Sequence, residues 1–279
     1  MKDIFEQIVE QSKTGIPLTS TDYIGEDGLL YCGKCHTAKQ CVVELLGESY
    51  TPYCLCDCEA ERQRQNHEEY LRSGKRLQML DNCFLYDNMR NWTFANDKGL
   101  NPPLIDACKA YAESFFLFEE EGRGLLLYGK CGTGKTYAAG CIANFLIDEG
   151  TAVKFRSVSQ LANEMMDGRK DRNAYMESLA SYPLLVLDDL ASERQTEFMD
   201  EVVREVIDAR CATNKPLVVT TNMTAEDLRK PKDLERTRIV SRLYERCIPV
   251  EAKGSDLRQS ALAKGYRKFK EMLGIGGDL

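Results

Sequence analysis

The eight residues from Gly129 to Thr136 constrain the fold more than any other part of this chain. They read Gly-Lys-Cys-Gly-Thr-Gly-Lys-Thr and fit the phosphate-loop pattern of Gly, four residues, Gly-Lys-Thr without a mismatch. The apolar run 125–128 before the loop predicts a buried strand, and the stretch 137–148 after it predicts a helix with one apolar face. Strand, loop and helix therefore come in the order that a nucleotide site requires.

Each residue type in this loop has a task in phosphate binding. Gly132 and Gly134 let the backbone turn its N–H groups toward a phosphate at the helix N-terminus, where the helix dipole also favours an anion. Lys135 is expected to reach the β- and γ-phosphates, and the Thr136 hydroxyl to take one Mg²⁺ position. The predicted nucleotide-binding residues are Gly129, Lys130, Cys131, Gly132, Thr133, Gly134, Lys135 and Thr136, together with Asp188 from a second motif.

That second motif follows the unbroken apolar run 184–187, which predicts a buried parallel strand. Carboxylates at the end of such a strand place Asp188 beside the metal and Asp189 toward the attacking water. A further predicted strand, 217–222, ends in the polar Asn222. Because strands and helices alternate along the chain, we predict an α/β fold with a parallel sheet covered by helices on both faces.

The remaining apolar patterns predict the other elements of this domain. They are strands at 152–156 and 247–251, helices at 157–166, 195–211 and 257–273, and a helix from Pro102 whose apolar positions continue to Phe118. The short stretch after residue 251 offers one amphipathic helix, so no separate helical lid is expected. Trp92 and Phe94 lie in the lead-in segment of this domain and either pack against the nucleotide base or belong to the core.

Two groups of cysteines near the N-terminus predict a metal site. Cys32-Gly-Lys-Cys35 is followed, after an interval typical of a zinc ribbon, by Cys54-Leu-Cys56-Asp-Cys58. Four of these five are expected to bind Zn²⁺; Cys56 and Cys58 are preferred in the second group, with Cys54 as the alternate. His36 and Cys41 complete no spacing. The alternative is that the cysteines are reduced and pack as small apolar residues.

The composition narrows the location and the partners. No apolar run approaches the ~20 residues that span a bilayer, and the first residues lack a signal-peptide core, so we predict a cytoplasmic protein without membrane contact. The net charge of −7 gives no global reason to expect nucleic-acid binding. A local strip would be needed, and its candidates are Lys154, Arg156, Arg169, Lys170 and Arg172.

Together the motifs resemble those of the AAA+ ATPases, and within them the DnaC-type helicase loaders of bacteria and phages, with the IstB-type transposition ATPases as near relatives. The resemblance rests on the loop 129–136, Leu-Asp-Asp-Leu at 187–190, Thr-Thr-Asn at 220–222 and Arg-Ile-Val-Ser-Arg-Leu at 238–243. It implies an AAA+ P-loop core without a separate lid. We expect a zinc-bearing, partner-binding module at 1–58, a helical linker at 59–80 and the ATPase domain at 81–279.

The resemblance also implies roles for single residues. Asn222 is similar to the sensor that orients the attacking water, and Arg238 to the arginine finger that reaches the γ-phosphate of a neighbouring subunit in a homo-oligomer. Arg242 is either a second contact of this kind or a structural ion-pair residue, and Arg258 resembles a sensor within the same chain. Because most hydrolytic members have Glu where this chain has Asp189, turnover is expected to be slow.

We therefore predict an ATP-dependent loader that binds ATP, Mg²⁺ and single-stranded DNA and delivers a replicative helicase of the DnaB type. Three alternatives remain at this point. The protein could assist a transposase, as IstB-type ATPases do, or act as an ATP-gated adaptor that barely hydrolyses ATP. A small-molecule kinase would need a lid or an acceptor pocket for which the sequence gives no sign.

Overall fold

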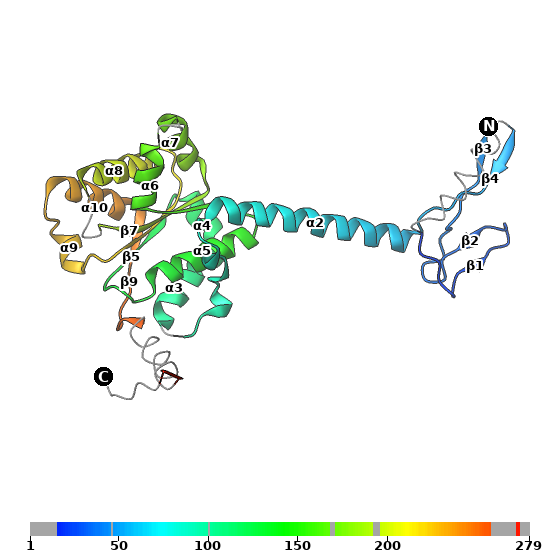
Figure 1. Cartoon of the computed structure of the whole chain (residues 1–279), viewed down its shortest axis with the longest axis horizontal. Helices are drawn as coiled ribbons and strands as arrows, with labels where there is room; N and C mark the ends of the chain where they lie inside the picture. Colours follow the sequence, from blue (N-terminus) through cyan, green and yellow to red (C-terminus); the bar gives the residue numbers. More distant parts are fainter. Residues whose placement is uncertain are drawn as a thin grey trace. The chain divides into compact units, whose positions relative to one another are not determined.

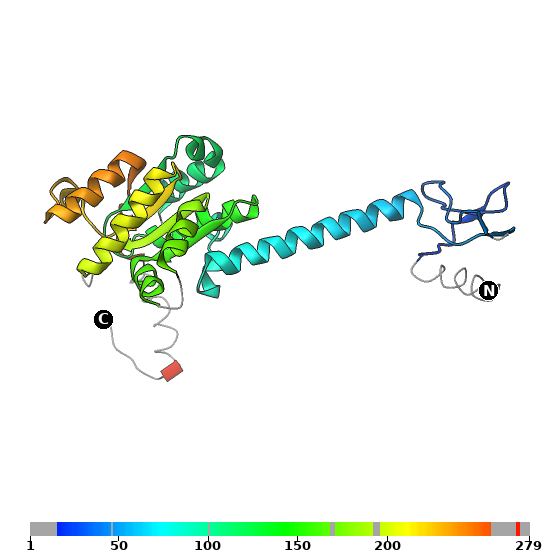
Figure 2. The same cartoon turned by 90° about the horizontal axis from the view of Figure 1, so that it is seen from above.

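The computed structural model describes residues 16–45, 47–99, 101–167, 171–191, 196–257 and 272–273. The chain divides into two compact units, residues 1–75 and 76–279, whose elements are labelled in Figure 1 and seen from a second side in Figure 2. The border between the units falls within helix α2 (Asp57–Cys83), which covers the linker predicted at 59–80. The functional division into 1–58, 59–80 and 81–279 stays a prediction.

The first unit has very little apolar core. Strand β1 (Tyr23–Ile24) pairs antiparallel with β2 (Leu30–Tyr31), and β3 (Val43–Leu45) with β4 (Glu48–Tyr50). Among its described residues, the buried side chains are those of Cys32, Lys39, Cys56 and Glu59. A module with so few buried apolar groups needs another source of stability, and metal binding is the usual one.

Helix α2 is solvated along most of its length, as its polar sequence predicts. Every residue from 61 to 78 is exposed. Only toward its end does the helix bury apolar side chains, when Leu80 and Cys83 enter the core of the second unit together with Phe84.

The second unit is built on a five-stranded sheet with the order β6-β7-β8-β5-β9, in which all neighbouring strands are parallel. The strands are β5 (Gly124–Tyr128), β6 (Val153–Ser157), β7 (Leu184–Leu190), β8 (Leu217–Thr221) and β9 (Cys247–Glu251). The helices are α3 (Pro102–Glu113), α4 (Phe115–Glu120), α5 (Lys135–Asp148), α6 (Val158–Met166), α7 (Arg172–Ser181), α8 (Glu197–Ala212), α9 (Ala225–Arg229) and α10 (Leu234–Arg246), with short 3₁₀ turns η1 (Asp87–Asn91) and η2 (Phe94–Asn96). The predicted α/β sheet is confirmed.

Both faces of the sheet are covered by helices, and each face has its own core (Figure 1). Along β7, Leu184 and Val186 pack with α3 and α5, whereas Leu185 and Leu187 pack on the opposite side with α6, α8 and α10. A strand buried on both faces has no polar side to show, which explains why its sequence is apolar without interruption.

Some predicted boundaries differ from the observed ones. The apolar pattern from Pro102 to Phe118 forms two helices, α3 and α4, which meet at Ser114. The break lets Phe115 and Phe118 both pack on Tyr111, at ring-centroid distances of 5.9 and 4.7 Å. The strand predicted at 184–187 continues to Leu190 and so includes both aspartates. The helix predicted at 257–273 lies almost wholly outside the described residues.

Within the described ranges, no helix combines the length and the apolar character that crossing a membrane requires.

Candidate nucleotide site and metal cluster

The phosphate loop has the backbone conformation that its glycines predict. Gly129, Gly132 and Gly134 have φ angles of 127°, 77° and 93°, in the left-handed region that glycine adopts without a steric cost. Space is short as well: a Cβ atom on Gly129 would lie 2.8 Å from the carbonyl oxygen of Ala252. A Cβ atom on Gly132 would lie 1.9 Å from a carboxylate oxygen of Asp256. Other residues at these positions would change the path of the loop.

Lys135 is the first residue of α5, and its side chain turns back over the loop. Its Nζ donates hydrogen bonds to the carbonyl oxygens of Gly129 at 2.8 Å and of Lys130 at 2.7 Å, and the residue is 6% exposed. The Thr133 hydroxyl also donates to the Lys130 carbonyl, at 2.9 Å. The ammonium group is therefore held within the loop that the sequence assigns to phosphate.

A cavity of about 520 Å³ brings the two predicted motifs together. It is lined by the loop residues Cys131, Gly132, Gly134, Lys135 and Thr136, by Asp188 and Asp189 of β7, by Thr220 and Asn222, and by Trp92, Tyr137 and Leu257. A basic side chain, a hydroxyl and two carboxylates around one cavity are the groups that a Mg²⁺–nucleotide complex requires.

The two aspartates have different surroundings. Burial raises the pKa of the Asp188 carboxyl, while hydrogen bonds from the Thr220 and Thr136 hydroxyls oppose this shift. Its Oδ1 accepts the Thr220 hydroxyl at 2.6 Å. The carboxylate of Asp189 is the more exposed, and its Oδ1 accepts a hydrogen bond from Asn222 Nδ2 at 3.2 Å. The structure thus places Asp188 beside the predicted metal ligand Thr136, and Asp189 beside the predicted sensor Asn222.

The segment after β9 and one residue before α3 also support the loop. Leu257 N donates to the Gly132 carbonyl at 2.9 Å, and Asn101 Nδ2 donates to the carbonyls of Thr133 and Lys253, at 2.9 and 3.0 Å. The sequence analysis missed Asn101. A polar residue directly before Pro-Pro signals a helix cap, but this side chain makes no capping bond and holds the loop instead.

Trp92 combines the two roles predicted as alternatives, a place beside the nucleotide and a place in the core. It lines the cavity, and it also packs on α5, where a Cβ atom on Gly140 would lie 2.5 Å from its ring. Its ring centroid is 5.9 Å from that of Tyr137. Phe94 packs on Phe145, at 6.1 Å, and belongs to the core.

Arg238 lies on α10 and lines a different cavity, of about 470 Å³, between α8 and α10. Its side chain is 59% exposed and forms an ion pair with Glu235 at 2.9 Å. Arg242, one turn later, is 53% exposed and pairs with Asp208 at 3.6 Å and with Glu245 at 3.0 Å, and both alternatives for this residue stay open. Arg258 lies outside the described residues.

Arg156 is buried and cannot belong to a DNA-binding surface strip, so the prediction is wrong for this residue. Arg156 is 4% exposed, bonds the carbonyl of Cys83 at 2.7 Å and pairs with Glu164 at 3.0 Å. Lys154 donates to the Asn82 carbonyl, and Arg172 pairs with Glu205 at 2.8 Å. Arg169 and Lys170 lie outside the described residues. The Arg156 side chain therefore connects β6 to Glu164 of α6 and to the Cys83 carbonyl inside the domain.

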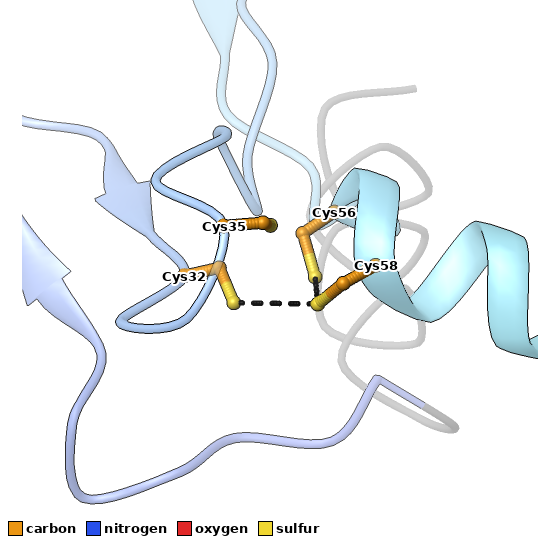
Figure 3. Close-up of side chains that lie close together, drawn as sticks. All are labelled: Cys32, Cys35, Cys56 and Cys58. Atoms are coloured by element: carbon orange, nitrogen blue, oxygen red, sulfur yellow. Dashed lines mark hydrogen bonds between the residues drawn. The ribbon is translucent and has the colours of Figure 1, made fainter.

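In the first unit, the thiols of Cys32, Cys35, Cys56 and Cys58 lie within 4.8 Å of one another. Figure 3 shows these side chains pointing toward one another: Cys32 and Cys35 come from the turn after β2, Cys56 lies directly before α2, and Cys58 lies in its first turn. The Sγ atoms of Cys32 and Cys58 are 3.8 Å apart, and those of Cys56 and Cys58 are 3.5 Å apart. Ligands at the ~2.3 Å of a Zn–S bond are separated by about 3.8 Å in a tetrahedron, so this donor set can hold Zn²⁺.

The neighbours of Cys32 and Cys35 favour the thiolate form of these two ligands. The N–H of Lys34 points at Cys32 Sγ from 3.4 Å, and the Thr37 hydroxyl, 3.1 Å from Cys35 Sγ, holds the pKa of that thiol well below its usual range. Cys54 is not in the cluster, because its thiol donates to the Ala38 carbonyl. His36 and Cys41 are not in it either.

The parallel sheet, the phosphate loop and the strand-end carboxylates define a P-loop protein with an AAA+ core. The chain belongs to the family described as IstB-like ATP binding protein, whose model matches residues 58–264. Two relatives are named replicative helicase loaders. DnaI of Bacillus subtilis is 26% identical over 56% of this chain and 52% of its own length, and DnaC of Buchnera aphidicola is 25% identical over 66% and 76%. The chain thus spans about half of the Bacillus protein.

A third relative is a putative ATP-binding protein in an insertion sequence of Mycobacterium tuberculosis, 31% identical over 37% of this chain and 42% of its own. Among solved structures, DnaI is similar with a TM-score of 0.52 at 25% identity, covering 62% of this chain and 94% of that one. The DnaC helicase loader has a TM-score of 0.51 at 25% identity, covering 60% and 100%. These similarities confirm the resemblance to the DnaC-type AAA+ proteins.

Proposed function

We propose that this protein is an ATP-dependent loader of a replicative helicase of the DnaB type. The observation that carries the proposal is the single cavity in which Lys135, Thr136, Asp188, Asp189 and Asn222 meet. Such a cavity suits a nucleotide-controlled protein, and two relatives of this chain are named replicative helicase loaders. Proteins of this kind act in DNA replication, and the predicted cytoplasmic location accords with that role.

In the proposed reaction, the main-chain N–H groups from Gly132 to Thr136 bind the phosphates at the start of α5. Lys135 exchanges the two loop carbonyls for β- and γ-phosphate oxygens. Thr136 and Asp188 would hold Mg²⁺, which would neutralise charge on the phosphates. Asp189 accepts a proton from the attacking water, and Asn222 fixes the orientation of that carboxylate. Because the aspartate side chain is short, we expect slow hydrolysis.

The proposal assigns Arg238 to the nucleotide of a neighbouring copy. Arg238 does not line the cavity proposed for the nucleotide of its own chain but a different one. Its side chain is more than half exposed, as a residue that reaches a second subunit must be. A guanidinium suits this task because its planar fork stays charged and binds phosphate oxygens in pairs. The protein would therefore work as a homo-oligomer joined through the Arg238 face.

The first unit is proposed to hold Zn²⁺ through Cys32, Cys35, Cys56 and Cys58 and to bind the helicase. Zinc would supply the folding free energy that its few buried apolar groups do not. Contact with single-stranded DNA is proposed for the second unit. Of the predicted strip, Lys154 and Arg172 are the described members that remain.

A second candidate is an ATPase that assists a transposase. It is favoured by the family match and by the relative from an insertion sequence. A third candidate is an ATP-gated adaptor that barely hydrolyses ATP. It is considered because this chain has Asp189 where most hydrolytic members of the family have Glu. Comparing single-turnover hydrolysis of the natural protein and Asp189→Asn separates the adaptor from the loader, because an adaptor would show no difference.

The deciding experiment offers the full-length protein, immobilised in ATP and Mg²⁺, to a purified replicative helicase and separately to a purified transposase. Lys135→Ala is the matched control, since it removes the phosphate contact together with the two hydrogen bonds to the loop carbonyls. Retention of the helicase only by the natural protein supports the loader. Retention of the transposase instead favours the second candidate, and equal retention by Lys135→Ala refutes control by ATP.

A further inference from the structure

Thr220 connects the two aspartates of the nucleotide site, although sequence patterns give it no role beyond a strand position. It lies in β8 and is 2% exposed. Its hydroxyl donates to Asp188 Oδ1 at 2.6 Å, and its oxygen accepts the main-chain N–H of Asp189 at 3.0 Å. One buried hydroxyl therefore binds the side chain of one aspartate and the backbone of the next.

The reason for this arrangement is an irregularity in the sheet. In the register between β7 and β8, Leu187 faces Val219 and Leu190 faces Thr221, so that two residues of β7, Asp188 and Asp189, stand opposite Thr220. An extra residue of this kind is a β-bulge, which re-aims side chains and interrupts the regular hydrogen bonds.

The bulge is visible in the packing as well. Regular alternation would place Leu187 and Leu190 on opposite faces of the sheet, but both belong to the core under α6, α8 and α10. Asp189 has a φ of 59°, in the left-handed region, where Asp is tolerated better than most side chains. Its N–H has the Thr220 oxygen as partner in place of a strand carbonyl.

We propose that Thr220 is a positioning residue for Mg²⁺-dependent ATP hydrolysis. Its hydroxyl fixes the orientation of the Asp188 carboxylate toward the metal, and its oxygen holds the bulge that points Asp189 toward Asn222. The inference rests on the proposed ATPase function and deepens it. It predicts that loss of the hydroxyl impairs the use of Mg²⁺ while the phosphate loop still binds nucleotide.

The chain offers a matched control in the next residue. Thr221 is 1% exposed and lies in the same strand, but its hydroxyl donates to the Leu190 carbonyl at 2.8 Å rather than to a carboxylate. The same hydroxyl accepts the Met223 N–H at 3.2 Å, so Thr221→Val removes a buried hydroxyl and both of its hydrogen bonds without touching Asp188. Any effect that Thr220→Val shares with it is a general effect on the sheet.

The experiment compares the full-length natural protein with Thr220→Val, Thr220→Ser and Thr221→Val. The fluorescence of Trp92, the only tryptophan, reports nucleotide binding with and without Mg²⁺, because this side chain lines the cavity. Single-turnover ATP hydrolysis is then measured across a Mg²⁺ titration. Should Thr220→Val not fold, Thr220→Ala removes the same hydroxyl without adding a methyl group next to the carboxylate.

For Thr220→Val we expect the Mg²⁺ concentration at half-maximal hydrolysis to rise about tenfold and the hydrolysis rate to fall roughly 10- to 100-fold, as for outer-shell partners of metal ligands. ATP binding without Mg²⁺ should stay within about twofold. Thr220→Ser should restore both quantities, and Thr221→Val should leave the Mg²⁺ dependence unchanged.

A Thr220→Val protein with natural Mg²⁺ dependence and rate would overturn the inference, as would an equal loss in Thr221→Val. These outcomes differ from failure of the proposed function. If the proposed function failed, the natural protein would bind ATP no better than Lys135→Ala does.

Discussion

Arg210 is the residue whose replacement tests most directly how the first residues of β7 and β8 are held in place. It lies in α8, is 2% exposed, and its guanidinium donates only to carbonyl oxygens, those of Leu179, Ala180, Tyr182, Pro183 and Pro216. Pro183 and Pro216 directly precede β7 and β8, the strands that contain Asp188 and Thr220. Burial lowers the pKa of Arg210 to about 10, so the group is still charged at neutral pH.

The perturbation is Arg210→Met, which keeps much of the side-chain volume and removes every donor. Five buried or partly buried carbonyls then lose a hydrogen bond, and at about 1 kcal/mol for each the loss approaches about 5 kcal/mol. Removing a buried charge relieves its desolvation, which offsets part of this loss and leaves about 3 kcal/mol. For a domain of this size, that corresponds to a fall in Tm of roughly 6–12 °C.

The assay is urea and thermal unfolding of the full-length protein, followed by circular dichroism. Arg172→Met is the matched control, because it removes an arginine whose ion pair with Glu205 is exposed, with side chains 42% and 31% accessible. Its free energy of unfolding should change by less than about 1 kcal/mol. If Arg210→Met were as mild as Arg172→Met, the carbonyl contacts would not stabilise the ends of β7 and β8, and the reasoning would be refuted.

Three further predictions concern the proposed sites. Cys56→Ser should lose bound Zn²⁺, and Cys54→Ser should keep it. Metal analysis and the Zn²⁺ released to a colorimetric chelator measure the difference, and equal zinc in both variants would refute the assigned cluster. Arg238→Ala should lower ATP turnover in the assembled oligomer by about 10³-fold, with unchanged nucleotide binding by tryptophan fluorescence; unaltered turnover would exclude it as the finger. Burial raises the pKa of Asp188, and Mg²⁺ binds the ionised carboxylate. Acidification should therefore weaken Mg²⁺ binding at a higher pH than it would for an exposed carboxyl. Mg²⁺ titrations at several pH values test this, and a loss of binding only at the pH of an exposed carboxyl would disprove it.

Much of this protein follows from local patterns in its sequence. The phosphate loop is a contiguous stretch whose glycines dictate a backbone path, so Gly129–Thr136 is recognisable without any neighbour. The parallel sheet follows from apolar runs that alternate with helical patterns, because strands buried on both faces must be apolar throughout. The spacing of Cys32 and Cys35 predicts one half of the metal cluster in the same way.

The tertiary structure decided what depends on residues that are distant in the chain. Cys56 and Cys58, rather than Cys54, face the first cysteine pair, and Arg156 turns into the domain to meet the Cys83 carbonyl instead of facing DNA. The bulge at Asp188 and Asp189 exists only because β8 lies beside β7 and offers a hydroxyl at Thr220. A sequence pattern records the period of one strand, but hydrogen-bond partners across a sheet are fixed by register, and register is a property of the folded chain.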